Sequence, residues 1–311
     1  MNWREIEMAY ILETSGLTKQ YKKQKALDQV DMHIKRGSIY GFIGRNGAGK
    51  TTFMKIISGL SYADKGEIYL FGEKINKHSE YFSRIGALIE NPGLYPNMSA
   101  YENLKMKCLC MGYSKKGYID ELIELVGLKE VGKKKVKKYS LGMKQRLGIA
   151  MALIGEPDIL VLDEPINGLD PQGILEVRQT IETLNKERNM TVLISSHILG
   201  ELSKFATHYG IIDHGLLVQE LTRDEMMTKC CERIEIKVEN TSKCCMVLDD
   251  MGYEKYKVMD KETICVFERI DESKELIVAL VNKGVYPSSV AVKLEALEDY
   301  YLGMTGGRMD A

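Results

Sequence analysis

A glycine-rich stretch that ends in a lysine and a threonine has the composition of a phosphate-binding loop. Residues 44–51 fit the spacing G-x-x-x-x-G-K-[ST] and directly follow the apolar run 39–43. Glycines let the backbone curl with its N–H groups pointing inward, and the N-terminus of the next helix attracts anions. We expect Lys50 to sit on the β- and γ-phosphates of a polyphosphate and Thr51 to offer its hydroxyl to Mg²⁺. Taken alone, the stretch is also compatible with a glycine-rich turn that matches by chance.

Two acidic residues, Asp163 and Glu164, directly follow a second apolar run at 159–162. Doubly wound sheets bind their ligands at the carboxyl ends of the strands. Asp163 would hold Mg²⁺ there through water, and Glu164 would polarise an attacking water as a general base. The alternative, a strand that merely ends in solvated acids, loses weight because a phosphate loop lies upstream.

A third segment, 139–146, precedes a predicted helix and places Ser140 as its N-cap. The serine hydroxyl and the N–H of Gly142 at an exposed helix N-terminus suit a terminal phosphate. By itself this segment would predict only a well-capped helix.

Alternating strands and helices surround these three segments. Strands are expected at 11–15, 30–34, 39–43, 67–70, 159–162, 191–195 and 209–213, and helices at 51–58 and 172–187. Between 92 and 154, apolar residues at three- and four-residue steps predict a helical insert with helices at 101–110, 118–126 and 144–154. The pattern predicts an α/β domain with a parallel sheet and helices on its faces.

The pattern changes after a tight turn predicted at His214 and Gly215. Thr222 and Glu225 form a capping box that opens a short helix to Cys230. Strand, helix, strand, strand, helix and strand are then expected at 234–238, 243–251, 255–258, 263–267, 272–282 and 288–292. This order is the split β-α-β pattern of a small α+β domain, and a final helix is expected at 294–302.

Composition narrows the class of protein. The 311 residues suffice for two domains, and the apolar and charged fractions, 44% and 28%, are those of a globular protein. The net charge of −1 gives no indication of a nucleic-acid partner. No apolar stretch approaches the ~20 residues of a membrane span. Residues 1–7 lack the apolar core of a signal peptide, and Met8 is an equally good start.

Cysteines and lysines form further clusters without a clear chemical motif. The cysteines include adjacent pairs at 230–231 and 244–245 but lack the C-x-x-C spacing of zinc or redox sites. Free thiols in a reducing cytosol are therefore expected rather than metal ligands. Five lysines lie within 133–138. A solvated charged loop is favoured there over a phosphate- or membrane-facing patch.

Together, these segments resemble the nucleotide-binding subunit of ATP-binding cassette (ABC) transporters over about residues 11–220. The resemblance identifies the Walker A loop at 44–52, the signature motif at 140–145, the Walker B strand at 159–164, the D-loop at 167–170 and the switch histidine at His197. It implies an α/β P-loop NTPase core of ABC type with an inserted helical subdomain, followed by a ferredoxin-like α+β domain. The expected boundaries are 9–220 for the first domain (helical subdomain about 92–154), 221–231 for a connecting helix and 232–311 for the C-terminal domain.

The resemblance also implies a role for each motif residue. Glu164, His197 and Lys50 would act in catalysis, with His197 sensing the γ-phosphate, and Mg²⁺ would be held by Thr51, Glu90 and Asp163. ATP would contact Tyr21, which stacks on adenine, and the residues Gly44, Asn46, Gly47, Ala48, Gly49, Lys50, Thr51, Thr52, Ser140 and Gly142.

Two departures from the commonest family pattern stand out. The signature motif carries Leu141 and Met143 where the common version, L-S-G-G-Q, has glycine and glutamine, although Ser140 and Gly142 remain. Glu90 stands where the family normally has a glutamine that touches Mg²⁺ and senses the membrane partner; a carboxylate can still bind Mg²⁺. Both features look like the bacitracin- and lantibiotic-resistance branch of exporters.

The implied function is ATP hydrolysis that drives export of a peptide antibiotic or similar amphiphile. Two cassettes, expected to be a homodimer, would close head to tail over two ATP molecules, with Lys50 and Glu164 of one subunit facing Ser140 of the other. The cassette would lie on the cytoplasmic face of the membrane, bound to a separate multi-span permease, without a nucleic-acid partner. The alternatives are an exporter ATPase for another substrate and a soluble cassette that acts on ribosomes or DNA. A non-enzymatic regulator is disfavoured because Glu164 and His197 are both present.

Overall fold

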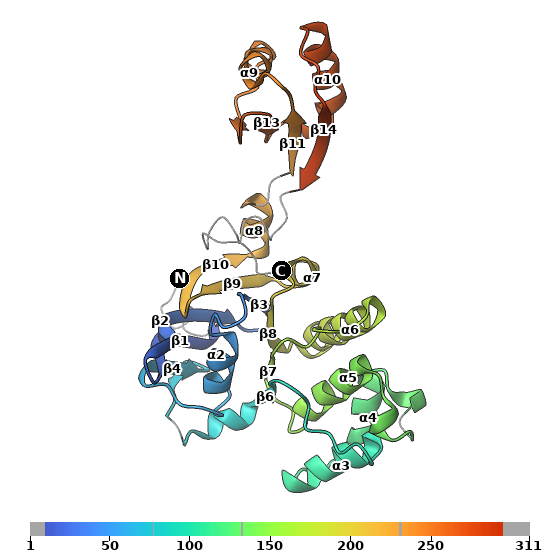
Figure 1. Cartoon of the computed structure of the whole chain (residues 1–311). Helices are drawn as coiled ribbons and strands as arrows, with labels where there is room; N and C mark the ends of the chain where they lie inside the picture. The colour runs from blue at the N-terminus through green and yellow to red at the C-terminus, as the bar shows by residue number, and fades with distance from the viewer. Residues whose placement is uncertain (1–9, 77, 132, 230–231, 295–311) are drawn as a thin grey trace. The chain divides into compact units, whose positions relative to one another are not determined.

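The computed structural model describes residues 10–76, 78–131, 133–229 and 232–294 (Figure 1). These residues divide into two compact units, one up to Arg223 and the other from Asp224 onward. The first unit contains two sheets and the second unit one, and each unit has its own buried core, so the two are described separately. Within the described ranges, no helix combines the length and apolar composition that crossing a membrane requires.

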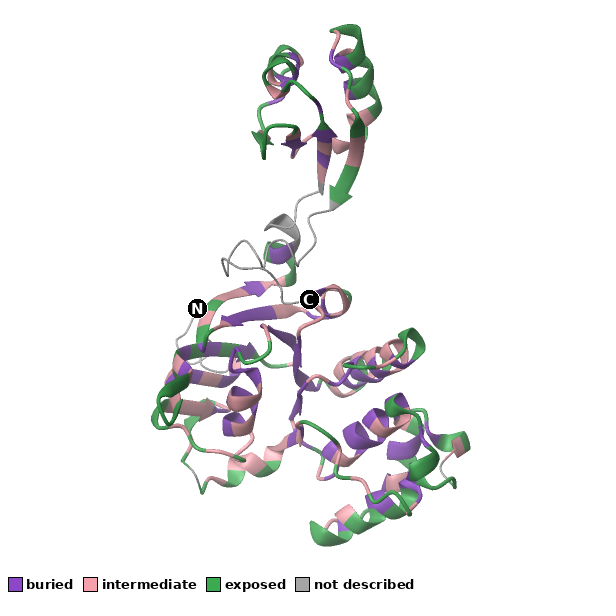
Figure 2. Cartoon of the chain, in the orientation of Figure 1, coloured by how far each residue is buried: buried purple, intermediate pink, exposed green. Residues whose placement is uncertain are grey.

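A six-stranded sheet with the order β10-β9-β3-β8-β7-β6 is the centre of the first unit. Its strands are β3 (Ile39–Ile43), β6 (Ile85–Leu88), β7 (Ile159–Leu162), β8 (Thr191–Ser196), β9 (His208–Asp213) and β10 (Leu216–Thr222). All neighbours are parallel except β9 and β10, which form a hairpin. Every residue of β3, β7 and β8 is buried, which explains why these strands are nearly continuous apolar runs (Figure 2).

Helices cover both faces of this sheet. Helix α2 (Lys50–Ile57) lies on one face and α6 (Pro171–Arg188) on the other (Figure 1). The short α7 (Leu199–Leu202) follows β8. Asp170 caps α6 by accepting a hydrogen bond from the N–H of Gly173, and proline at the first helical position supports this start.

A second, antiparallel sheet packs on the other side of α2 and has the order β2-β1-β4-β5. Its strands are β1 (Tyr10–Tyr21), β2 (Gln24–Lys35), β4 (Lys65–Leu70) and β5 (Glu73–Lys74). Leu12 and Met32 of this sheet share one buried cluster with Phe53 of α2 and with Phe42 and Val161 of the central sheet. This common core fixes the start of α2, and therefore the phosphate loop, between the two sheets.

The helical segment of the first unit contains α3 (Ala100–Cys110), α4 (Tyr118–Leu125) and α5 (Leu141–Ala152). Short 3₁₀ turns accompany it at Glu80–Arg84, Lys129–Val131 and Val136–Lys138. A capping box between Ser99 and Glu102 begins α3. The five lysines of 133–138 are exposed, while Val136 between them is buried and anchors the loop.

The second unit is a four-stranded antiparallel sheet with helices, preceded by α8 (Arg223–Lys229), in the sequence order expected. Its elements are β11 (Glu232–Lys237), α9 (Thr241–Asp250), β12 (Tyr256–Val258), β13 (Thr263–Val266), a 3₁₀ turn (Ile270–Glu272), α10 (Ser273–Asn282) and β14 (Ser289–Leu294). The strand order β12-β13-β11-β14 is that of a ferredoxin-like fold. Ile234, Ile236, Leu248, Leu276 and Leu280 form its separate core.

Some of the elements predicted near the C-terminus and at the edges of the sheets differ from those in the structure or lie outside the described residues. Cys230 and Cys231 lie outside the described residues, and so does the final helix expected at 294–302, except that Leu294 ends β14. The turn at His214 and Gly215 is confirmed, since both residues have positive φ, 47° and 82°, in the β9–β10 hairpin. Strands β5, β6 and β10 were not expected from the sequence.

Candidate functional site

The glycine-rich loop between β3 and α2 is folded so tightly that glycine is required at two positions. Gly49 has φ 114°, and a Cβ there would lie 2.4 Å from the carbonyl oxygen of Ala26 on β2. A Cβ at Gly44 would lie 2.6 Å from the carbonyl oxygen of Ile212 on β9. The loop can therefore curl only because these side chains are absent.

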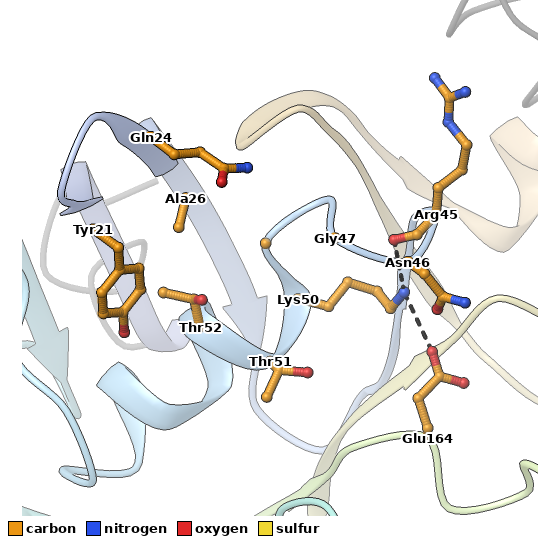
Figure 3. A pocket seen from close by; sticks show the side chains of 11 residues that line it. Tyr21, Gln24, Ala26, Arg45, Asn46, Gly47, Lys50, Thr51, Thr52 and Glu164 are labelled. Carbon is orange, nitrogen blue, oxygen red and sulfur yellow. Dashed lines mark hydrogen bonds and ion pairs between the residues drawn. The ribbon is translucent and has the colours of Figure 1, made fainter.

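Lys50 lies at the centre of this curl and is only 5% exposed. Its Nζ donates hydrogen bonds to the carbonyl oxygens of Gly44, at 2.5 Å, and Arg45, at 3.2 Å. The same ammonium lies 3.2 Å from Oε1 of Glu164 (Figure 3). A buried cation held in this way presents a fixed positive charge to any anion that enters the loop.

An open pocket extends from this loop across the start of α2 to the edge of β1 and β2 (Figure 3). The pocket is lined by Tyr21, Gln24, Ala26, Arg45, Asn46, Gly47, Gly49, Lys50, Thr51, Thr52 and Glu164. Figure 3 shows Tyr21 at one end and Glu164 at the other, with Thr51 and Thr52 between them. An aromatic ring at one end and a cationic loop at the other suit a ligand with a flat base and a polyphosphate chain.

Asp163 lies at the carboxyl end of β7 and is 5% exposed. Its Oδ2 accepts a hydrogen bond from Thr51 Oγ1 at 2.7 Å, and its Oδ1 accepts one from Ser195 Oγ at 2.6 Å. The carboxylate and the Thr51 hydroxyl are thus brought together from two elements far apart in the sequence. Hard oxygen ligands of this kind are those that Mg²⁺ prefers.

Glu164 is held in a left-handed backbone conformation, with φ 49°. Its N–H donates to Ser195 Oγ at 2.8 Å, and its carboxylate Oε2 lies 2.8 Å from Nδ1 of His197. Together with the contact to Lys50, these interactions place the carboxylate between two basic side chains. Lys50, Thr51, Asp163, Glu164 and His197 are therefore gathered at one site.

Ser140, Gly142 and Glu90 lie apart from this pocket. Ser140 caps α5 by accepting a hydrogen bond from the N–H of Met143 at 3.2 Å, and Gly142 is buried near Gly173. Among the described residues, none that lines the pocket belongs to α5. The nucleotide contacts expected of Ser140 and Gly142 therefore stay predictions.

Glu90 has φ 63°, and its carboxylate accepts a hydrogen bond from Lys55 at 2.6 Å. This bond raises the pKa of the Lys55 ammonium. The Glu90 side chain is 63% exposed, and the residue does not line the pocket. Its expected contact with Mg²⁺ is untested and remains a prediction.

Several residues of the site were not expected from the sequence. Gln24, Ala26 and Arg45 line the pocket, and Arg45 forms an ion pair with Asp213 at 3.3 Å. Ser195 contacts both Asp163 and Glu164. The only sequence signal for Ser195 was its position two residues before His197, since a serine inside an apolar strand has no motif of its own.

The fold and the site define a P-loop nucleotide-binding protein. A parallel sheet, a glycine-rich loop that leads into a helix, and acids at the end of a neighbouring strand are combined at one edge of the sheet.

Comparison with known proteins narrows this class. Residues 27–167 match the family model described as "ABC transporter". The bacitracin transport ATP-binding protein BcrA of Bacillus licheniformis is 41% identical over 96% of this chain and 99% of its own length. The lantibiotic transport ATP-binding protein SrtF of Streptococcus pyogenes is 44% identical over 69% of this chain and 92% of its own.

A solved structure supports the same assignment. It is a dimeric, post-hydrolysis state of an ATP-binding cassette bound to ADP and phosphate. It is 26% identical to this chain, with a TM-score of 0.61 over 68% of this chain and 98% of the cassette. The chain thus belongs to the ATP-binding proteins of ABC transporters. It is a nucleotide-binding ATPase subunit, as the sequence analysis predicted.

Proposed function

We propose that this ATPase hydrolyses ATP with Glu164 as the general base. The observation that carries this proposal is the position of the Glu164 carboxylate, 3.2 Å from Lys50 Nζ and 2.8 Å from His197 Nδ1, at the mouth of the phosphate loop. Glu164 accepts a proton from the attacking water and orients that water toward the γ-phosphate. Lys50 neutralises charge on the β- and γ-phosphates, and His197 holds both the γ-phosphate and the Glu164 side chain.

The residues around Asp163 fit a magnesium ion. Two oxygen ligands from separate elements, Thr51 Oγ1 and Asp163 Oδ2, already lie 2.7 Å apart, and Asp163 is nearly inaccessible to bulk water. When bound, Mg²⁺ would neutralise charge that develops on the phosphate oxygens. Thr51 and Asp163 would hold it. Glu90, released from Lys55, would be the third ligand, either directly or through a water molecule.

ATP would bind with its base on Tyr21 and its phosphates in the loop, and Ser140 and Gly142 of a second cassette would complete the site. Tyr21 lines the pocket at the end opposite Glu164, whereas the exposed Ser140 caps the start of α5, and neither Ser140 nor α5 contributes to the described pocket lining. ABC cassettes form dimers, and one structural neighbour is a dimer with its hydrolysis products bound. A homodimer that closes over two ATP molecules accounts for both observations.

The transported compound is proposed from the relatives. Two proteins named for bacitracin and lantibiotic transport align over most of their own lengths with this chain. We infer that this subunit drives export of a peptide antibiotic or a similar amphiphile through a separate multi-span permease. The cassette would be held by that permease at the cytoplasmic face of the membrane.

The Glu164→Gln variant tests the catalytic assignment. The amide keeps the shape of the side chain but cannot accept the proton, so ATP should still bind while turnover falls by a factor of at least ~100. The ATP-bound dimer of this variant should then accumulate, and size-exclusion chromatography detects it. Turnover at the wild-type rate in this variant would remove Glu164 from the catalytic role. Co-purification with ribosomes rather than with a membrane protein would contradict the transport role.

A further inference from the structure

One buried hydroxyl connects the two acids of the site. Ser195, near the carboxyl end of β8, has no exposed surface. Its Oγ donates a hydrogen bond to Asp163 Oδ1 at 2.6 Å and accepts one from the N–H of Glu164 at 2.8 Å. The hydroxyl thus holds the side chain of one acid and the backbone of the next.

The bond to the backbone matters because Glu164 is strained. A φ of 49° is uncommon for a residue with a side chain, and such a conformation persists only where its surroundings enforce it. The bond from the Glu164 N–H to Ser195 supplies this support. With this left-handed backbone conformation, the Glu164 carboxylate lies 3.2 Å from Lys50 Nζ and 2.8 Å from His197 Nδ1.

The bond to Asp163 supports the same turn from the other side. Asp163 Oδ1 is occupied by Ser195, so Oδ2 remains for Thr51. A carboxylate fixed at both oxygens leaves Ser195 in one orientation, with its lone pair toward the Glu164 N–H. Removal of the hydroxyl would leave the buried Oδ1 of Asp163 and the N–H of Glu164 without this partner, and the strained turn without support.

We infer that Ser195 is a positioning residue for ATP hydrolysis, whose hydroxyl holds the Glu164 turn against Asp163 and thereby places the catalytic carboxylate. This inference rests on the proposed role of Glu164. Ser195 does not itself line the nucleotide pocket, and it acts through Glu164, which does.

The chain offers a matched control in the next residue. Ser196 is equally inaccessible and belongs to the same strand, but its hydroxyl accepts a hydrogen bond from the N–H of Ile198 at 2.9 Å. Ser196→Ala therefore removes a buried hydroxyl from β8 without removing the contacts to Asp163 and Glu164. A general loss of packing or hydrogen bonding in β8 would affect both variants.

The experiment compares Ser195→Ala, Ser195→Thr, Ser196→Ala and wild type by steady-state ATP hydrolysis. Ser195→Ala should lower kcat by roughly 10- to 100-fold, as loss of a supporting hydrogen bond does at other sites, with the KM for ATP changed by less than about threefold. Ser195→Thr keeps the hydroxyl and should recover most of the lost kcat. Ser196→Ala should stay within about threefold of wild type. Thermal unfolding shows whether each variant is folded. If Ser195→Ala is not folded, Ser195→Cys replaces it.

A double variant tests whether Ser195 acts through Glu164. If it does, Ser195→Ala added to Glu164→Gln should lower the residual single-turnover rate by less than about threefold, because the positioned carboxylate is already gone. Three outcomes would each overturn this inference but leave the proposed function intact: losses of rate in the double variant that multiply, an undiminished kcat in Ser195→Ala, or an equal loss of kcat in Ser196→Ala. Wild-type turnover by Glu164→Gln would overturn the proposed function and this inference with it.

Discussion

Lys50 at the start of α2 and Asp163 at the end of β7 are stable in nearly inaccessible positions because each has defined partners. Lys50 donates to two carbonyl oxygens of the loop and contacts Glu164, and Asp163 accepts hydrogen bonds from Thr51 and Ser195. A buried charge without such partners would cost several kcal/mol. The site is therefore arranged for anionic phosphates before any ligand enters, which limits the reorganisation that hydrolysis requires.

Tyr21 gives a prediction at the scale of the residue. Tyr21 is 48% exposed at the end of the pocket, and the ammonium of Lys19 lies 5.3 Å from the centroid of its ring. Tyr21→Ala should weaken ATP binding by about 1–3 kcal/mol, since stacking of a base on an aromatic ring contributes this much. Titration of the Glu164→Gln variant with ATP measures the affinity without hydrolysis.

Tyr21→Phe is the control for this prediction because it keeps the ring and removes only the hydroxyl. Its affinity should remain within about twofold of the parent protein. An equal loss in Tyr21→Phe and Tyr21→Ala would mean that the hydroxyl, rather than the ring, contacts the nucleotide. An unchanged affinity in both would exclude Tyr21 from the site.

The residues of the site differ in how well the sequence predicts them. Lys50 and Thr51 are part of one contiguous motif, and Asp163 and Glu164 end an apolar strand, so their proximity follows from the sheet edge alone. Ser195 is a single hydroxyl in an apolar strand, and its contacts depend on the side-by-side pairing of β7 and β8. To predict such a role, one must know which strands are neighbours in the sheet. The local sequence pattern does not contain this information.

At the scale of elements, the strands that were predicted are those with a clear local sequence pattern, and those that were missed depend on distant pairing. Long apolar runs such as β3 and β7 are recognisable because both faces of the sheet are covered. Strand β6 is short and includes Gly86, so its sequence resembles a loop. It pairs with β7, far along the chain, and the local sequence does not reveal this pairing. The order of strands and helices described between 232 and 294 was predicted because each of these elements has its own local pattern.

Gly86 gives a prediction at this scale, because it is where β6 meets α5. A Cβ there would lie 2.1 Å from the carbonyl oxygen of Ala152 and 2.9 Å from Pro157 Cγ. Gly86→Ala should lower the free energy of unfolding of the first unit by at least about 1–3 kcal/mol, because neither backbone nor proline ring can yield easily. Thermal unfolding in the presence and absence of ATP measures the change and identifies the unit that binds nucleotide.

Gly93→Ala is the matched control for Gly86→Ala. Gly93 lies on the same connection from β6 to α3, and a Cβ there would meet no atom within 4 Å. Its stability should stay within about 0.5 kcal/mol of wild type. Equal losses in the two variants would show that the cost comes from the glycine backbone and not from the contact between β6 and α5.

At the scale of the whole molecule, each of the two described units has a core of its own, but one copy of the chain holds only part of the proposed site. The core of the first unit includes Phe42 and Phe53, next to the phosphate loop, whereas that of the second unit includes Leu248 and Leu280. Ser140, which the proposed mechanism places on the γ-phosphate, is exposed at the start of α5. The proposed mechanism therefore requires a second copy, and this requirement can be tested by mixing defective copies.

Lys50→Ala and Ser140→Arg would each inactivate a homodimer for a different reason. Lys50→Ala removes the cation of the loop, and Ser140→Arg places a bulky side chain on the surface that would face the nucleotide of the partner. A mixed dimer has one site with both defects and one site with neither. Random mixing of co-expressed copies should therefore restore about a quarter of the wild-type sites. ATP hydrolysis by the purified mixture, relative to each variant alone, measures the recovery.

The control mixture combines Lys50→Ala with Glu164→Gln. Both residues line the same pocket of one copy, so each site of a mixed dimer carries one defect and hydrolysis should not recover. Recovery only in the first mixture requires that Ser140 completes the site of the other copy. Equal recovery in both mixtures, or in neither, would contradict a site shared between two copies. The exposed N-terminus of α5 is then the part of the molecule on which the dimeric mechanism depends.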